Sequence, residues 1–122
     1  MTLDALRRLC LSFPGATEQI QWGADLVFKV GGKMFCVAST EGAPAVAMSF
    51  KCDDETFAEL VERDGLIPAP YLARAKWVAM QRFDSLPARE LTPLIKQSYD
   101  LVVAKLPKGT RDSLNRPKKS RA

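Results

Sequence analysis

Two consecutive glycines, Gly31-Gly32, constrain the fold more than any other feature of this sequence, because they separate two segments with strand character. Residues 26–30 and 33–40 flank them, and a two-residue glycine loop suits the primed turn of a β-hairpin, which needs positive φ angles. The sequence therefore predicts an antiparallel pair of strands. In this hairpin the predicted opposite pairs are Val30 with Lys33, Phe28 with Phe35 and Leu26 with Val37.

Helical patterns stand on both sides of the hairpin. Thr2 is suited to capping a first helix, whose apolar residues recur at helical spacing until Pro14-Gly15 ends it. Asp53 caps a second helix that extends to about residue 63. Pro87 opens the last helical region, in which Thr92-Pro93 is either a kink or the cap and first position of the main helix. The second is preferred, because a proline inside a helix costs about 3 kcal/mol.

Further strands are predicted at residues 18–22, 45–51 and 76–83, whereas residues 66–75, which contain two prolines, are expected to be irregular. The order of elements is then helix, antiparallel strands, helix, strand, helix. This order predicts an α+β fold in which the helices pack on one face of an antiparallel sheet.

Alternation along the predicted strands assigns their side chains to two faces of the sheet. Because helices cover only one face, the other is expected to be open to water. We interpret this open face as a flat platform of small residues with Trp77 between lysines, suited to a base or to a partner's side chain. The alternative is that Trp77 belongs to the core, since a one-residue slip in register reverses every side chain. The predicted core face includes Phe28, Phe35, Val37, Met48, Phe50, Val78 and Met80, and the predicted open face Lys29, Ala38, Ala47, Ser49, Lys51, Trp77 and Gln81.

Composition excludes several classes of protein. The 122 residues, 47% of them hydrophobic, suffice for one domain with one core, and no apolar stretch approaches the roughly 18 residues of a membrane-spanning helix. Histidine is absent, which excludes Ser–His–Asp and Cys–His nucleophile systems and imidazole metal ligands. Cys10, Cys36 and Cys52 form no CxxC motif, so neither a disulfide framework nor a zinc site is predicted, and a reducing cytosol is the simplest compartment. We therefore expect a cytoplasmic, non-catalytic protein without a cofactor, and favour a monomer.

The formal net charge of +4 is concentrated near the C-terminus. Residues 105–122 contain seven basic residues and one acidic residue, a charge of +6, so residues 1–104 carry −2. This distribution predicts one domain over residues 1–106 and a flexible basic tail over residues 107–122. Such a tail attracts polyanions through phosphate contacts without sequence specificity, or serves only to keep the chain soluble.

Several short motifs follow one another along residues 1–106. They are Pro14-Gly15-Ala16 with Glu18, Gly32-Lys33-Met34-Phe35, Met48-Ser49-Phe50-Lys51, Pro70-Tyr71-Leu72, Lys76-Trp77, and Leu94 with Ser98-Tyr99. In this order they resemble the MmcQ/YjbR family of small bacterial proteins. The resemblance implies a frataxin-like (CyaY-like) α/β sandwich and a DNA-binding protein with a double-wing arrangement of hairpins.

The resemblance also implies which positions recur in the family. Carried over by position, its recurrent polar and aromatic residues fall on Trp22, Lys33, Lys51, Lys76, Trp77, Ser98 and Tyr99. Family members often have a histidine just before the tryptophan, where this chain has Ala75 or Lys76. A role that needs an imidazole at that place is therefore not expected here.

Nucleic-acid binding without catalysis, and with weak sequence preference, is the leading hypothesis from the sequence. Lys33 would project at the hairpin turn, Trp77 would stack on a base, and other basic residues would contact phosphates. The predicted contacts are Lys51, Arg74, Lys76 and Arg82 in the domain, and Lys108, Arg111, Arg116, Lys118, Lys119 and Arg121 in the tail.

Three other functions remain open on the sequence alone. A protein–protein adaptor would use the open sheet face around Trp77, since an exposed tryptophan is a good interface anchor. A hard cation would find oxygen ligands near Asp53, although acids at a helix start usually complement the helix dipole. An enzyme is the least favoured, because the candidate reactive groups have no partner at motif spacing. The possible cation ligands are Asp53, Asp54, Glu55, Glu59 and Glu62, and the candidate reactive groups are Lys33, Cys36, Tyr71 and Tyr99.

Overall fold

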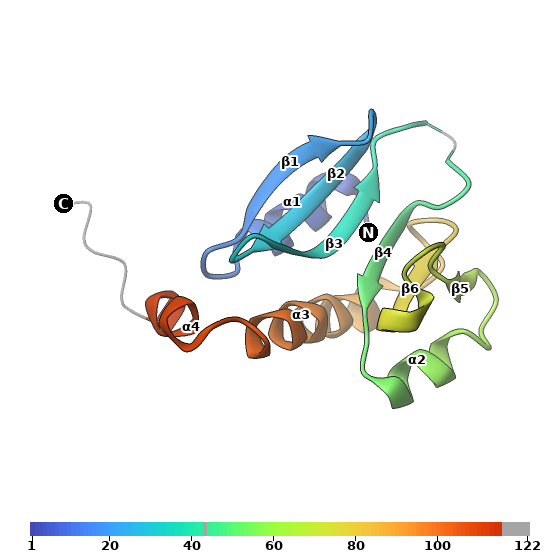
Figure 1. Cartoon of the computed structure of the whole chain (residues 1–122). Helices are drawn as coiled ribbons and strands as arrows, with labels where there is room; N and C mark the ends of the chain where they lie inside the picture. Colours follow the sequence, from blue (N-terminus) through green and yellow to red (C-terminus); the bar gives the residue numbers. More distant parts are fainter. Residues whose placement is uncertain (43, 116–122) are drawn as a thin grey trace.

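Among the residues that the structure describes, six antiparallel strands form one sheet in the order β1-β2-β3-β4-β6-β5 (Figure 1). The computed structural model describes residues 1–42 and 44–115. The strands are β1 (Thr17–Gln21), β2 (Asp25–Val30), β3 (Lys33–Ser39), β4 (Met48–Lys51), β5 (Leu66–Pro68) and β6 (Trp77–Met80). The helices are α1 (Leu3–Leu11), α2 (Asp54–Leu60), α3 (Ala88–Ala104) and α4 (Lys108–Asn115), with a 3-10 turn η1 (Ala73–Ala75).

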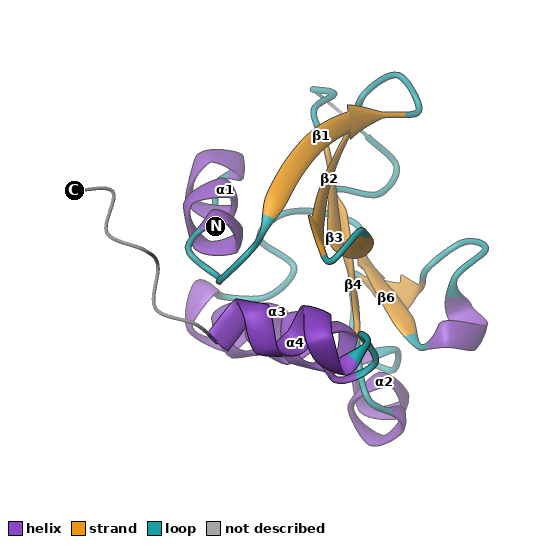
Figure 2. Ribbon diagram, turned by 60° about the vertical axis from the view of Figure 1, so that its left-hand side comes forward, coloured by secondary structure: helices purple, strands orange, loops and turns teal. Residues whose placement is uncertain are grey.

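The helices lie on one side of the sheet, and the main core lies between the two layers (Figure 2). Leu6 of α1, Leu60 of α2 and Ile95 of α3 are buried in the same cluster as the phenylalanines of β2, β3 and β4. The α+β fold predicted from the sequence, with helices packed on one face of an antiparallel sheet, is therefore confirmed.

Side-chain caps set the start of the first two helices, as the sequence predicted. Thr2 Oγ1 accepts a hydrogen bond from the Ala5 amide at 3.1 Å, and Asp53 Oδ1 accepts one from the Thr56 amide at 2.7 Å. The hydrogen bonds from Thr56 also lower the pKa of the Asp53 carboxyl. Asp53 thus has a structural role at the beginning of α2.

The β2–β3 hairpin turns at Gly31-Gly32 as predicted, with φ angles of 58° and 80° that only glycine adopts without strain. Val30 pairs with Lys33, the first of the predicted pairs. The register then shifts between Phe28 and Lys29, because β3 contains one more residue than β2 in this stretch.

Phe35 is the extra residue of this β-bulge. The observed pairs are Phe28 with Cys36 and Leu26 with Ala38, so the predicted pairs of Phe28 with Phe35 and of Leu26 with Val37 are wrong. Phe35 and Cys36 are both buried in the main core, although they are consecutive. Consequently Ala38 faces the core and Val37 faces the opposite side of the sheet, which reverses their predicted assignments.

Two hydroxyl groups of α3 hold the helix layer to backbone atoms of other segments. Ser98 Oγ donates to the Phe35 carbonyl oxygen at 2.6 Å and accepts from the Lys51 amide at 2.9 Å. The Tyr99 hydroxyl donates to the Pro14 carbonyl oxygen at 2.5 Å. Ser98 therefore joins the bulge of β3 to the end of β4.

Helix α3 begins at Ala88 and contains Pro93 in its interior, so the interpretation of Thr92-Pro93 as its start is wrong. The additional turn contains Leu91, which is fully buried. Burying a leucine contributes about 1.5–3 kcal/mol, which is comparable with the roughly 3 kcal/mol cost of an interior proline. Pro93 is itself exposed, so the hydrogen bond it lacks lies toward solvent.

Residues 66–75 are more regular than predicted, because they contain β5 and η1. Strand β5 pairs with β6 at the end of the sheet, where Pro68 lies opposite Val78. An edge strand tolerates a proline, since one side of its backbone has no neighbour to receive a hydrogen bond. The local sequence did not indicate a strand because proline is rare in strands elsewhere.

The segment after residue 106 also differs from the prediction. Residues 108–115 form helix α4, whereas a flexible tail was expected from residue 107. Leu114 on this helix packs against the main core and contacts Gly15. The apolar contact of one leucine therefore attaches the beginning of the basic segment to the domain.

Candidate functional site

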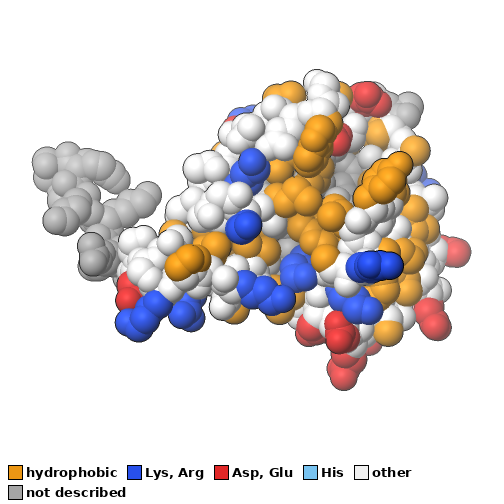
Figure 3. Space-filling model, viewed as in Figure 1, with side chains coloured by type: hydrophobic (Ala, Val, Ile, Leu, Met, Phe, Trp, Pro, Cys, Tyr) orange, Lys and Arg blue, Asp and Glu red, His pale blue; other side chains and the backbone are white. Residues whose placement is uncertain are grey.

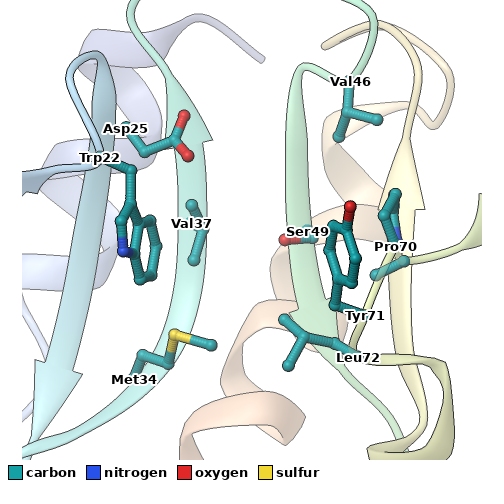
Figure 4. Close-up of a pocket in the computed structure, with 11 residues that line it drawn as sticks. Trp22, Asp25, Met34, Val37, Val46, Ser49, Pro70, Tyr71 and Leu72 are labelled. Atoms are coloured by element: carbon teal, nitrogen blue, oxygen red, sulfur yellow. The ribbon is translucent and has the colours of Figure 1, made fainter.

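The face of the sheet opposite the helices carries an apolar groove of about 530 Å³, which we call the sheet-face groove (Figure 4). Val37, Ser49 and Ala79 of three neighbouring strands contribute to its lining. Figure 4 shows the rings of Trp22 and Tyr71 on opposite sides of the groove. The complete lining is Trp22, Asp25, Met34, Val37, Val46, Ser49, Ala69, Pro70, Tyr71, Leu72 and Ala79.

Tyr71 occupies a backbone position that usually requires glycine or asparagine. The Leu72 amide donates to the Ala69 carbonyl at 3.1 Å, and this closes a turn with Pro70 second and Tyr71 third. Proline at the second position and a positive φ at the third, here 66°, are features of a type II turn. A side chain in this conformation costs roughly 1–2 kcal/mol, and the Tyr71 ring, at 104% relative accessibility, buries no surface that would offset it.

Trp22 combines the same two properties on the other side of the groove. Its φ is 51°, it precedes Gly23 in the β1–β2 turn, and its side chain is 66% exposed. Positive φ angles are rare for bulky residues, and backbone strain concentrates at functional sites. Two strained, exposed aromatic residues beside one apolar groove therefore identify it as the candidate site.

Replacing Tyr71 with glycine is expected to leave the free energy of unfolding unchanged or to raise it by up to about 1 kcal/mol. Glycine relieves the strain at positive φ, and its greater freedom in the unfolded chain offsets part of this gain. Urea denaturation followed by circular dichroism measures the change. Tyr71→Ala is the control, since it removes the ring and keeps the strain. A loss of more than about 1 kcal/mol in Tyr71→Gly would mean that the ring stabilises the fold.

The platform predicted around Trp77 is wrong, because this side chain is only 4% exposed. Trp77 does lie on the side of the sheet away from the main core, in a second small cluster with Ala69 and Ala79. The preceding loop covers it: the Ala69 amide donates to the Trp77 carbonyl at 2.9 Å, and the Trp77 amide to the Leu72 carbonyl at 3.2 Å. A buried indole is not available to stack on a base.

Lysines from three separate elements gather around a second, smaller hollow of about 210 Å³. Lys33 begins β3, Lys51 ends β4, and Lys105 follows α3. Lys51 Nζ also donates to the Ala75 carbonyl oxygen at 2.6 Å, which brings it beside the flanking residues Arg74 and Lys76. We call Lys33, Lys51, Arg74, Lys76 and Lys105 the basic cluster.

Figure 3 shows how charge and apolar surface are arranged on the face seen in Figure 1. Lysine and arginine side chains gather below the apolar hollow of this face, over the β2–β3 hairpin and the neighbouring ends of the sheet and α3. Lys33 of the basic cluster directly precedes Met34 of the groove lining, so the basic cluster adjoins one end of the sheet-face groove.

The basic cluster carries an excess of positive charge, although the nearby Asp54 carboxylate opposes part of the lowering of the Lys51 pKa. Within residues 1–42 and 44–115, none of its side chains forms a salt bridge with a carboxylate. Partial burial, reinforced by the charge of Lys105, lowers the pKa of the Lys51 ammonium group. Lys76 Nζ instead lies 5.2 Å from the centre of the Phe57 ring. Positive groups held together in this way attract an anionic ligand.

The opposite end of the groove is acidic. Burial, with a further contribution from Glu41, raises the pKa of the Asp25 carboxyl group. Asp25 begins β2, whereas Lys33 of the basic cluster pairs with Val30, five residues further along the same strand. At a rise of about 3.3 Å per residue, roughly 17 Å separates these two positions. The groove is therefore polarised along its length.

Other predicted phosphate contacts lie away from this surface. Arg82 follows β6 at the end opposite Lys76 and pairs with Asp84 at 2.9 Å. On α4, Lys108 pairs with Asp112 at 3.1 Å, and Arg111 belongs to the same helix. Arg116, Lys118, Lys119 and Arg121 lie outside the described residues. Of the predicted residues, the structure thus brings Lys33 and Lys51 together around one hollow, and Lys51 reaches the backbone between Arg74 and Lys76.

Sequence reasoning did not select the two aromatic residues of the groove as binding residues. Trp22 was identified only as a recurrent family position, and Tyr71 only as part of a family motif and as a possible reactive group. Their turns contain a usable signal, because a large aromatic residue beside Gly23 or after Pro70 occupies a place where glycine or asparagine is usual. Lys105 was counted only as part of the basic segment.

The groups considered for metal binding and catalysis have other surroundings. The part of the chain that the structure describes brings together no group of three or more cysteine, aspartate or glutamate side chains suited to a metal. All three cysteines are buried, and burial raises the pKa of the Cys52 thiol to about 12. Such a thiol is protonated at neutral pH and is a poor nucleophile. Among the described helices, none is long and apolar enough to cross a lipid bilayer.

The fold and the site define a small α+β domain in which, among the described residues, α1 to α4 pack on one face of the sheet and a polarised groove lies on the other. The YjbR family model matches residues 11–101, and this chain belongs to the YjbR family. The Escherichia coli (strain K12) protein named "Uncharacterized protein YjbR" is 32% identical over 119 residues, which cover 93% of this chain and 98% of the relative.

Two solved structures have the same fold. The crystal structure of Deinococcus radiodurans protein DR2400, a DUF419 domain, has a TM-score of 0.82 and 29% identity, covering 99% of this chain and 93% of the other. A protein from Pseudomonas syringae has a TM-score of 0.68 over 83% of this chain and 98% of its own, and at 17% identity it shows likeness of fold alone.

Proposed function

We propose that this protein binds DNA without catalysing a reaction and with little sequence specificity. The observation that carries the proposal is the basic cluster, in which cations from separate elements are held together without carboxylate partners among the described residues. Lysine ammonium groups are point charges that contact phosphates, and phosphate contacts position a protein without reading bases. The basic residues at the C-terminal end, beginning with Lys108, add to this attraction.

A salt titration tests the proposal with the full chain and a fluorescently labelled oligonucleotide. Log affinity is expected to fall linearly with log salt, by about 0.7 for each phosphate contact on a single strand. Five contacts would give a slope of about −3.5. A chain ending at residue 115 lacks four basic residues and is expected to give a shallower slope. Absence of measurable binding at about 50 mM salt would contradict the proposal.

A protein–protein adaptor is the second candidate function, and the exposed rings of Trp22 and Tyr71 favour it. Tryptophan and tyrosine are the residues most often found to anchor interfaces. The adaptor site would be the sheet-face groove, in place of the surface around Trp77 expected from the sequence. This function predicts a partner whose binding is lost in Trp22→Ala and persists at high salt, whereas DNA binding weakens with salt.

A further inference from the structure

We infer that the sheet-face groove is a binding site for an unpaired base of single-stranded DNA, with the adjoining phosphates on the basic cluster. This inference rests on the proposed DNA binding and names the form of DNA and the part of the protein that holds a base. It differs from the expectation drawn from the sequence, since Trp77 is buried and a different pair of aromatic residues lies at the surface.

The two rings beside the groove are suited to stacking on bases. Trp22 and Tyr71 stand on opposite sides of it, both largely exposed and both in strained backbone conformations (Figure 4). Every base has an apolar aromatic face, so stacking on such residues binds single strands with little sequence preference. The volume of about 530 Å³ falls in the range of pockets that accept small organic groups.

The charge distribution favours one orientation of a bound nucleotide in the groove. Phosphates are attracted to Lys33, Lys51 and their neighbours at one end, and are repelled by Asp25 at the other. A nucleotide therefore fits with its base in the apolar part and its phosphate toward the lysines. An entirely apolar peptide segment would leave the basic cluster without a partner, so the charge favours the nucleic acid.

Two features distinguish single-stranded DNA from related ligands. A duplex hides the faces of its bases in the stack, so only an unpaired base offers a face to Trp22 or Tyr71. Among the described residues that line the groove, polar groups come from Asp25, Ser49 and the polar atoms of the two aromatic residues, and the other lining side chains are apolar. Deoxyribose suits such a surface better than ribose, whose 2′-hydroxyl needs a hydrogen-bonding partner.

The experiment compares the full chain with Trp22→Ala and Tyr71→Ala, using a labelled single-stranded DNA oligonucleotide of mixed sequence. Its second probe is an abasic strand with the same number of phosphates. Each variant is expected to bind the oligonucleotide about tenfold more weakly, because stacking on one ring is lost, and to bind the abasic strand as the unchanged protein does. Ile20→Ala is the matched control, since Ile20 is a 55% exposed apolar residue outside the groove lining, and no change is expected.

Tryptophan fluorescence provides a second measurement. The chain has two tryptophans, of which Trp77 is buried, so quenching by the oligonucleotide is expected from Trp22 and is expected to be absent in Trp22→Phe. Equal affinity for the abasic strand and the oligonucleotide, with no effect of either alanine variant, would overturn the groove assignment and leave the proposed DNA binding intact. Tighter binding of duplex DNA, or of RNA of the same sequence, would also overturn it. If neither strand binds at low salt, the proposed function itself fails.

Discussion

Replacing Ser98 with alanine is expected to lower the free energy of unfolding by about 2–4 kcal/mol. Ser98 is completely buried, and its hydroxyl stands between the Phe35 carbonyl and the Lys51 amide, at 2.6 and 2.9 Å. Alanine leaves both backbone groups without this partner, and each unsatisfied buried group costs about 1–3 kcal/mol. The expected loss of stability is smaller than the summed cost of two unsatisfied buried groups, because the Lys51 amide is only partly buried. Urea denaturation followed by circular dichroism measures the loss.

Ser12→Ala is the matched control for this substitution. Ser12 Oγ donates to the Leu9 carbonyl at 2.6 Å, but this bond is exposed, so water replaces it and a change within about 0.5 kcal/mol is expected. A loss below about 1 kcal/mol in Ser98→Ala would contradict the role assigned to Ser98. It would mean that β3 and β4 move together and that the Phe35 carbonyl and the Lys51 amide pair directly when the hydroxyl is removed.

This hydroxyl also explains why the hairpin could be predicted only in part. The turn at Gly31-Gly32 depends on the glycines themselves, so a local pattern was sufficient to find it. At the bulge, the Phe35 carbonyl accepts a hydrogen bond from Ser98, which lies 63 residues further along the chain. A partner at that distance leaves no trace in the alternation of the strand, and the register was wrong from that point onward.

The burial of Trp77 was not readable from the sequence for a similar reason. Alternation correctly placed Trp77 away from the main core, but the layer that covers it is an irregular loop around Leu72. Loops of this kind have no periodicity that indicates which face of a sheet they cover. The exposed rings at Trp22 and Tyr71 were more accessible to prediction, because aromatic residues in left-handed turns conflict with the local backbone preference.

The basic cluster also brings together residues that are far apart in the sequence. Lys33, Lys51 and Lys105 come from three elements, and only the fold shows that they surround one hollow. The sequence indicated only that the positive charge is concentrated in a separate segment after residue 104. The structure adds that Lys105, at the start of this segment, joins lysines of the sheet. The charged segment and the domain are thus connected at the candidate site.

The triple variant Lys33→Gln, Lys51→Gln, Lys105→Gln is expected to bind single-stranded DNA about 500-fold more weakly at about 50 mM salt. Each phosphate contact contributes about 0.7 to the salt slope, which corresponds to nearly a factor of ten in affinity between about 1 M and 50 mM salt. Affinities of the variant and the unchanged chain are therefore expected to converge near 1 M salt. Fluorescence anisotropy across this range measures both effects.

A second triple variant, Arg8→Gln, Arg89→Gln, Lys96→Gln, also removes three positive charges, but from helices α1 and α3 on the opposite side of the sheet. It is expected to change the affinity far less, because these residues lie outside the basic cluster. The cluster variant is expected to change in stability by less than about 0.5 kcal/mol. Its lysines form no salt bridges with carboxylates among the described residues, and the bond from Lys51 to the Ala75 carbonyl is exposed, so water replaces it. If both triple variants weaken binding equally, the attraction depends on net charge alone, and the basic cluster is not the phosphate site.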